Sequence, residues 1–205
     1  MVSRRFLVAQ VSQEKTKYRA IDDMKESGVN SAYFALERLR LDDVDHIAAL
    51  AARLAALSAE GEVVSIPLSD GTLMQGPLRA DFRSGIRWQG RCLDLSKAYR
   101  QVPLSSGARR FAVLLVQRPC GSWAYFVGQA LLFGACAAVH SFNRVSKSIH
   151  HLMIHYGSSV CGQYFDDFPL LEPCQSAAMS SRSVEHLLQS LGWRFAEGLR
   201  QRDSL

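Results

Sequence analysis

Paired cysteines, long apolar runs and internal repeats are all missing from this chain of 205 residues. The five cysteines form no CxxC pair and are unevenly spaced, which argues against a disulfide framework or a zinc module and favours a reducing compartment. The apolar run Phe6–Ala9 is too short for a signal peptide. The run Ala48–Leu57 is interrupted by Arg53 and is too short to span a bilayer. We therefore expect an intracellular protein, in cytoplasm or nucleus, without a membrane partner.

A strong excess of one charge is also absent. The net charge is +5 and the isoelectric point is near 9.1, which is compatible with a polyanionic partner but does not establish one. Hydrophobic residues make up 48% of the chain, so a hydrophobic core can form and we do not expect global disorder. The length suits one ordinary domain, or one and a half small ones.

Local patterns predict both helices and strands. Helical periodicity covers Ser31–Leu57, with Asp42 or Asp43 as the N-cap and an apolar stripe that we assign to the core, and it recurs in Ala137–Tyr156 and Ser183–Leu191. Turns or loops are predicted at Gln13–Lys17, Glu26–Asn30 and Gly76–Gly85. Strand-like segments are Phe6–Val11, Tyr18–Asp23, Val63–Leu68, Trp88–Leu93, Arg110–Gln117, Trp123–Val127 and Trp193–Phe195.

Two adjacent carboxylates, Asp166 and Asp167, interrupt the aromatic and strand-forming run Gln163–Phe168. Ionised side chains are rarely buried without a partner, so we predict a tight β-hairpin with both acids at its tip. Adjacent strand residues point to opposite faces, and a bend is therefore needed if both acids are to serve one site. A solvated Asp-Asp turn is the alternative.

A third acid, Asp94, ends the predicted buried strand Trp88–Leu93 and precedes a short helical turn over Leu95–Gln101. An acid in that position is held rigidly. Three carboxylates can hold two Mg²⁺ ions ~3.5–4 Å apart. Magnesium takes few carboxylates and keeps positions for substrate phosphates, so the acids predict a two-metal site for phosphate chemistry.

Other polar groups are candidates for binding. Lys15, Lys17 and Arg19 fall on one predicted hairpin and could neutralise a phosphate chain, although a solvated charged hairpin is the more common explanation. Gly134 lies among small residues and permits close approach of the backbone to a ligand. The pair His151 and His155 has metal-binding spacing, but no third ligand is evident and a solvated helix face is favoured.

In order and spacing, these motifs resemble the fingers and palm of a reverse transcriptase (RNA-directed DNA polymerase) of the retrotransposon type. The resemblance extends over nearly the whole chain, and its five motifs together are far more specific than any one of them. The segments that carry it are Lys17–Arg19 followed by Asp23 for the fingers hairpin, Cys92–Gln101 and Leu131–Arg144 for the first two palm motifs, Tyr164–Asp167 for the Tyr-x-Asp-Asp motif, and Leu187–Trp193 for the fourth motif.

The resemblance implies an α+β fold with the right-hand palm of a polymerase. That palm is a small antiparallel sheet backed by the helices near 137–156 and 183–191, with β-hairpin fingers and no thumb or RNase H. It implies a fingers-like part over residues 1–90 and a palm over 91–205. The implied cofactor is a pair of Mg²⁺ ions, with Mn²⁺ as a substitute. The implied partners are an RNA or DNA template with its primer and deoxynucleoside triphosphates.

Residue roles follow from the same resemblance. Asp94, Asp166 and Asp167 would be the catalytic metal ligands, with the main-chain carbonyl of Leu95 as a further ligand. The resemblance also implies a set of nucleotide-binding residues. Lys17 and Arg19 would bind the phosphates, and Tyr99 would be the aromatic gate that selects deoxyribose. Phe133 and Gly134 would flank the nucleotide and the template.

The chain departs from the family pattern in three ways. Leu132 stands where the family has proline, only Arg200 can replace the usual lysine of the fourth motif, and the sequence stops at Leu205 before any thumb. We expect a piece of a longer polyprotein, or alternatively a truncated, catalytically dead retroelement remnant that at most binds nucleic acid. A second alternative is an unrelated two-metal phosphohydrolase, which would not explain Lys17–Arg19 or Tyr99.

Overall fold

The computed structural model describes residues 1–11, 16–59, 61–78 and 86–196. They belong to two compact units, one of Met1–Arg40 with Ser96–Lys147 and one of Leu41–Leu95 with Ser148–Leu205. Each unit combines segments from before and after residue 90, and the predicted division into a fingers-like part and a palm at that residue stays a prediction. Lys15, part of the predicted turn at 13–17, part of the predicted loop at 76–85 and Arg200 lie outside the described residues.

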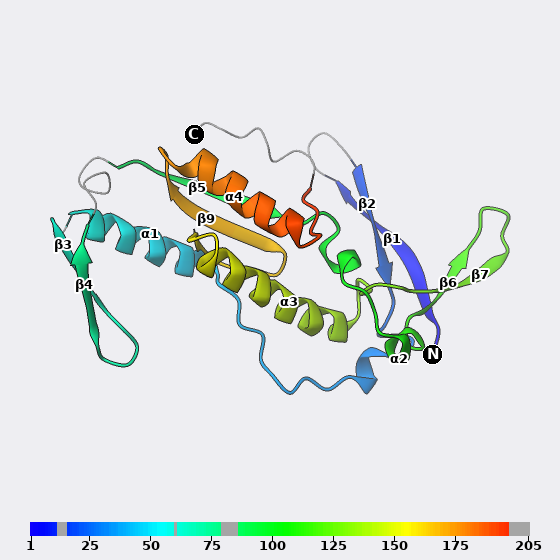
Figure 1. Ribbon diagram of the computed structural model, residues 1–205. Coiled ribbons are helices and arrows are strands. Elements are labelled where there is room, and N and C mark those ends of the chain that lie inside the picture. The colour runs from blue at the N-terminus through cyan, green and yellow to red at the C-terminus, as the bar shows by residue number, and fades with distance from the viewer. Residues whose placement is uncertain (12–15, 60, 79–85, 197–205) are drawn as a thin grey trace. The chain divides into compact units, whose positions relative to one another are not determined.

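The first unit contains a four-stranded mixed sheet in the order β2-β1-β6-β7 (Figure 1). Strand β1 runs antiparallel to β2 and parallel to β6, and β6 forms an antiparallel hairpin with β7. The predicted strands in this unit are confirmed with small changes of boundary. Their bounds are Ser3–Val11 for β1, Thr16–Asp22 for β2, Val113–Gln117 for β6 and Trp123–Val127 for β7.

Helix α3 (Cys136–His155) confirms the predicted helix and contributes to both units, with Lys147 the last residue in the first. Its start is fixed by a side chain from a distant turn. The Asn30 side chain accepts a hydrogen bond from Cys136 N at 2.8 Å and donates one to Gly134 O at 3.0 Å. Such capping satisfies a helix-end amide that has no partner within the helix. The remaining helical elements of the first unit are short: η1 Asn30–Ala32, η3 Ala98–Gln101 and α2 Ser106–Arg109.

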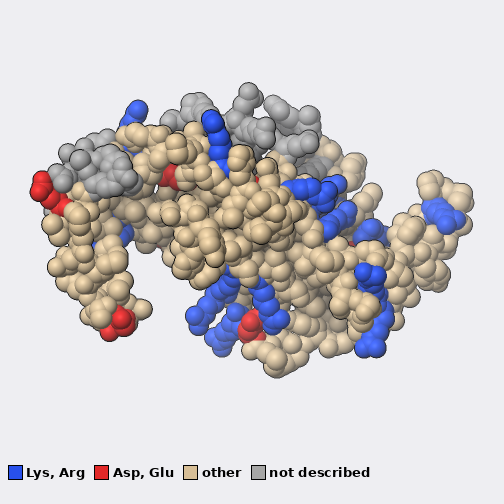
Figure 2. Space-filling model, in the orientation of Figure 1, with Lys and Arg blue, Asp and Glu red and all other residues tan. Residues whose placement is uncertain are grey.

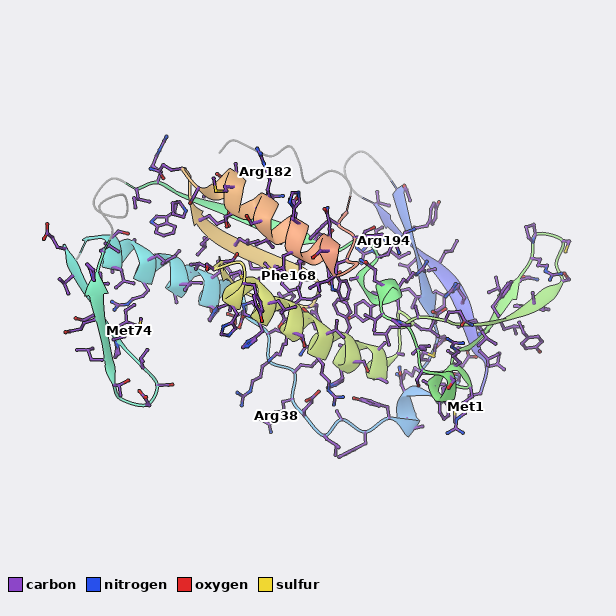
Figure 3. The ribbon with its side chains drawn as sticks, in the orientation of Figure 1. Met1, Arg38, Met74, Phe168, Arg182 and Arg194 are labelled. Atoms are coloured by element: carbon purple, nitrogen blue, oxygen red, sulfur yellow. The ribbon has the colours of Figure 1, made fainter. Side chains whose placement is uncertain are left out.

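The second unit contains a three-stranded antiparallel sheet in which β9 (Asp167–Pro173) lies between β5 (Trp88–Asp94) and β8 (Val160–Cys161). Alternate residues of the sheet are buried on one face, including Leu93 and Phe168. Phe168 is labelled in Figure 3, where β9 runs alongside the helices. Buried residues of α3 and of α4 (Ala177–Ser190) complete this core: Ile149, Met153, Val184 and Leu188.

Helix α4 is joined to the sheet by an ion pair as well as by apolar packing. Arg91 on β5 contacts Glu185 on α4 at 2.5 Å, with both side chains largely buried. Helix α4 begins at Ala177, six residues before the predicted start at Ser183, because a serine-rich segment that favours caps and turns is here helical. The strand predicted at Trp193–Phe195 is reduced to a single bridge between Leu95 and Phe195.

The helix predicted from Ser31 begins only at Val44, so about the first half of that prediction is wrong. Asp43 accepts a hydrogen bond from His46 N at 3.0 Å, which is the geometry of an N-cap. Helix α1 (Val44–Ala59) has no fully buried residue, and its apolar stripe is half-buried at best. The assignment of that stripe to the core is therefore also wrong.

A hairpin of β3 (Val63–Pro67) and β4 (Leu73–Pro77) completes the described part of the second unit. Strand β4 was not predicted because Gly76 and Pro77 are typical of loops; a proline is tolerated here at the strand end. The chain is thus mixed α+β, as predicted, with four α-helices and three sheets in its described part. In those residues no helix has both the length and the apolar character required to cross a membrane.

Candidate active site

Two of the three predicted acids are direct cross-strand partners in the second unit. Asp94 is the last residue of β5 and pairs with Asp167, the first residue of β9. Residues directly opposite each other in an antiparallel pair share a face of the sheet. The adjacent pair of Leu93 and Phe168 is buried on the helix-covered face, so the two carboxylates lie together on the other face.

The third acid lies in a tight turn that leads into β9. Tyr164 N donates to Asp167 O, and Asp167 N donates to Tyr164 O, both at 2.9 Å. These bonds leave Phe165 and Asp166 as the two turn residues, with Phe165 at a φ of 51°. The predicted hairpin is present, but only Asp166 lies at its tip; Asp167 already belongs to the strand. This turn interrupts the alternation of side chains between the adjacent acids Asp166 and Asp167, as is needed if both are to serve one site.

The charges of the three acids interact. The pKa of Asp167 is raised from its ordinary value by burial, and further by the charges of Asp166 and Asp94. The thiol of Cys92, on the same face, donates to Asp167 Oδ1 at 3.9 Å and partly offsets that rise. Burial and the charge of Asp167 raise the pKa of Cys92 to about 11. Mutual repulsion of this kind makes the site favourable for a cation.

The donor set suits a hard cation, since Mg²⁺ prefers carboxylate oxygens. Among the described residues, however, no group of three or more His, Cys, Asp or Glu side chains is placed so that it could hold a metal ion. Magnesium commonly binds through one or two carboxylates together with substrate phosphates. The chemistry of the acids therefore fits this ion, whereas a complete protein cage is not formed. The role of the buried Leu95, whose carbonyl was the further predicted ligand, stays a prediction.

The residues predicted to bind the nucleotide belong to the first unit and are described within it. The Tyr99 ring stacks on Phe142 with centroids 4.6 Å apart and an interplanar angle of 21°. It meets Phe133 edge-on at 5.8 Å. Phe133 is 42% exposed, so part of this residue remains accessible to a ligand. Tyr99 and Phe133 are thus brought together, as a shared function would require.

Gly134 has a structural role that the sequence did not reveal. Its φ is 118°, and a Cβ at this position would lie 2.2 Å from the carbonyl oxygen of Asp22. Asp22 N also donates to Phe133 O at 3.0 Å. The close approach that this glycine permits is therefore to the chain's own backbone. Asp22 is in turn held by a bidentate ion pair with Arg5, at 2.7 and 3.0 Å.

Arg19 is exposed on β2, opposite Val8 of β1. Lys17 lies two residues earlier on the same strand, so its backbone position is on the same face. Its side chain is outside the described part of the structure. The phosphate-binding role of both residues stays a prediction.

Sequence reasoning missed the residues that hold the acid-bearing turn. Asp42 Oδ2 accepts a hydrogen bond from Gln163 N at 2.9 Å, and Asp42 N donates to Gln163 O at the same distance. Gln163 is buried, and its side-chain amide donates to Phe165 O at 3.3 Å. The only signal in the sequence was the Asp42-Asp43 doublet, where we considered a helix cap alone.

The histidine pair fits its simpler interpretation. The rings of His151 and His155 lie 4.1 Å apart between centroids, and both residues are exposed on α3. No third ligand joins them among the residues that the structure describes.

A scan against protein-family models and a search of curated proteins found no match to this chain.

Proposed function

We propose that this chain carries the catalytic core of an RNA-directed DNA polymerase of the retroelement type, which adds deoxynucleotides to a primer under the direction of a template. The observation that supports this most is the cross-strand pair of Asp94 and Asp167, with Asp166 in the adjoining turn. Carboxylates crowded at the end of two neighbouring strands, with a raised pKa at one of them, are typical of a functional site.

The acids would hold Mg²⁺, or Mn²⁺ in its place, with the Leu95 carbonyl as a further ligand. When bound, the metal supplies charge neutralisation for the phosphates and for the attacking hydroxyl. The chain's own contribution is positioning: the β5–β9 register fixes two carboxylates, and the Tyr164–Asp167 hydrogen bonds fix the third. In the first unit, Tyr99 would discriminate against ribose, with Arg19 and Lys17 on the phosphates.

The surface charge is compatible with a nucleic-acid partner. The chain has a net charge of +5, and the face drawn in Figure 2 has more Lys and Arg side chains than Asp and Glu. Such a surface attracts a phosphate backbone through a salt-sensitive, sequence-independent term. This supports the class of partner and leaves the choice between RNA and DNA to experiment.

Primer extension on an RNA template with Mg²⁺ tests the proposal directly. We expect deoxynucleotide addition by the chain, and a loss of about 100-fold or more in Asp94→Asn and in Asp167→Asn, since each removes charge that is needed in the transition state. Asp45→Asn, at an exposed position of α1, is the matched control and should keep its activity. Undiminished addition by the two site variants would remove the assignment.

The catalytically dead remnant is the second candidate, and one observation favours it: the described residues contain no complete group of metal ligands. It would bind RNA or DNA in a salt-dependent manner without turnover. Extension assays should therefore be repeated with a reverse-transcriptase thumb region supplied in trans. Activity that appears only then would support the polymerase, and inactivity in both assays would support the remnant.

A further inference from the structure

We propose that the second unit contains a binding site for a small organic cation with an aromatic body, separate from the three acids. The site is a pocket of about 220 Å³. Its lining comes from α1, from the residue after β4, from the first residue of β5, from the start of β8 with the two residues before it, from the end of β9 and from the start of α4. All of these elements belong to the second unit.

The pocket walls are largely apolar. Leu54 and Leu57 of α1 face it from one element, and Leu78 and Leu171 from two others. Trp88 adds an indole ring to the lining. An aromatic ring of this size can stack with a flat ligand or lie against a cation. Small-molecule sites generally combine such walls with a few polar groups that orient the ligand.

The polar group of this pocket is the carboxylate of Glu172, a residue with only 4% of its surface exposed. It accepts hydrogen bonds from the hydroxyls of Ser180 and of Ser181, the latter at 3.4 Å. Both serines lie on α4. A carboxylate has about four lone-pair sites, so these two donors leave acceptor capacity for a ligand. The carboxylate is thus oriented by the protein and still able to bind a donor.

Charge complementarity defines the ligand. No Lys, Arg or His is present among the described residues that line the pocket. By contrast, Glu185 on the same helix α4 is paired with Arg91. A buried carboxylate is stabilised by a hydrogen-bonded cation. A planar amidinium or guanidinium can form two parallel hydrogen bonds to it, and an attached ring would occupy the apolar part.

The pocket is distinct from the candidate active site. Glu172 is near the end of β9 and Asp167 is its first residue. The two residues are five positions apart, an odd separation, so their side chains point to opposite faces of the sheet. Binding at the pocket is therefore measurable without any polymerase activity, and its failure would leave the proposed function untouched.

Benzamidine is the probe that we would use, with neutral benzamide as its isosteric control. The readout is the indole N–H signal of Trp88 in a ¹⁵N–¹H spectrum, assigned with Trp88→Phe. We expect a saturable shift with benzamidine and a Kd of about 1 mM or tighter, as suits a fragment-sized ligand. Benzamide should bind at least about tenfold more weakly. Equal shifts with both compounds, or none with benzamidine, would overturn the proposal.

Three variants locate the site. Glu172→Gln removes the charge, and Ser58→Phe places a ring in the pocket from the incompletely buried helix α1. Both should abolish the benzamidine shift. Ala52→Phe adds the same ring at an exposed position of α1 outside the pocket and should bind as the parent does. Loss of dispersed indole signals in Glu172→Gln would mean that this variant does not fold. The test then depends on Ser58→Phe, and unchanged benzamidine binding in that variant would refute the site.

Discussion

At the scale of single residues, the negative charges around Asp167 favour cation binding but reduce the stability of the folded state. Burial and two neighbouring carboxylates raise its pKa, which means that the folded state disfavours its ionised form. Between the ordinary pKa and the raised one, the folded state binds more protons than the unfolded state, so stability falls as pH rises through that window. The penalty is fully present above the raised pKa.

Asp167→Asn should therefore be more stable than the parent at neutral pH. The gain should be below about 1 kcal/mol, because solvent still screens a carboxylate that is only partly buried. It should fade as the pH falls and vanish only well below about 4, where the carboxyl is protonated in both the folded and the unfolded state. Thermal unfolding followed by circular dichroism across pH measures this, with Asp45→Asn as the control for a general charge effect. An Asp167→Asn protein that melts at or below the parent temperature at pH 7 would contradict it.

Gly134 is a second residue at which the addition of one atom should change the stability of the fold. Gly134→Ala would place a Cβ 2.2 Å from the Asp22 carbonyl and would force a side chain into a backbone conformation that L-residues rarely adopt. We expect a loss of about 2 kcal/mol or more in the free energy of unfolding, measured with denaturant. Gly107→Ala, where nothing lies within 4 Å, should change stability by much less. Equal effects at both positions would show that the close approach is not limiting.

At the scale of elements, the segment before α1 holds the turn that carries the acids. Asp42→Ala removes the acceptor for Gln163 N and should reduce the free energy of unfolding by about 1–2 kcal/mol. It should also reduce primer extension, because the Tyr164–Asp167 turn follows directly. Asp43→Ala removes the helix cap, at about 1 kcal/mol, and should keep its activity. Equal primer extension by the two variants would show that the Asp42 contact is not needed for the arrangement of the acids.

Elements with a strong local pattern were predictable from the sequence. The strands β1, β5 and β7 and the helix α3 follow from apolar periodicity, because that pattern depends on residues close in the chain. The cap of α1 was also predictable, at Asp42 or Asp43, and Asp43 fills it. The second role of this doublet was not predictable, since Asp42 makes its hydrogen bond to a residue 121 positions away. The left-handed conformation of Phe165 was missed for the opposite reason, that a bulky residue normally avoids it.

The acids themselves were found because they stand in strand-associated positions, but their arrangement was not. Which strand pairs with β5, and in which register, depends on contacts that no local pattern specifies. The pocket around Glu172 was also not predictable from the sequence, because it is assembled from residues of six separate parts of the chain. In the sequence alone, nothing distinguishes Glu172 from any other acidic residue next to a proline.

At the scale of the whole molecule, the chain passes between its two units more than once. A fragment of residues 91–205, the predicted palm, would lack Trp88–Gly90 of β5 and the whole of α1. We expect it to show no cooperative unfolding transition, whereas the full chain should show one. Thermal unfolding of both by circular dichroism measures this. A cooperative transition in the fragment near that of the full chain would mean that the palm folds alone and that the first 90 residues are dispensable.

The β5–β9 register has a consequence for how the gene can change. Deleting one codon within β5 would turn Asp94 toward the helices and bring Leu95 to its place, because side chains alternate along a strand. Deleting two codons would shorten the strand and leave Asp94 on its present face. Length variation in β5 among descendants of this gene should therefore occur in even steps wherever the acid pair is still under selection, and odd steps would mark copies that have lost it.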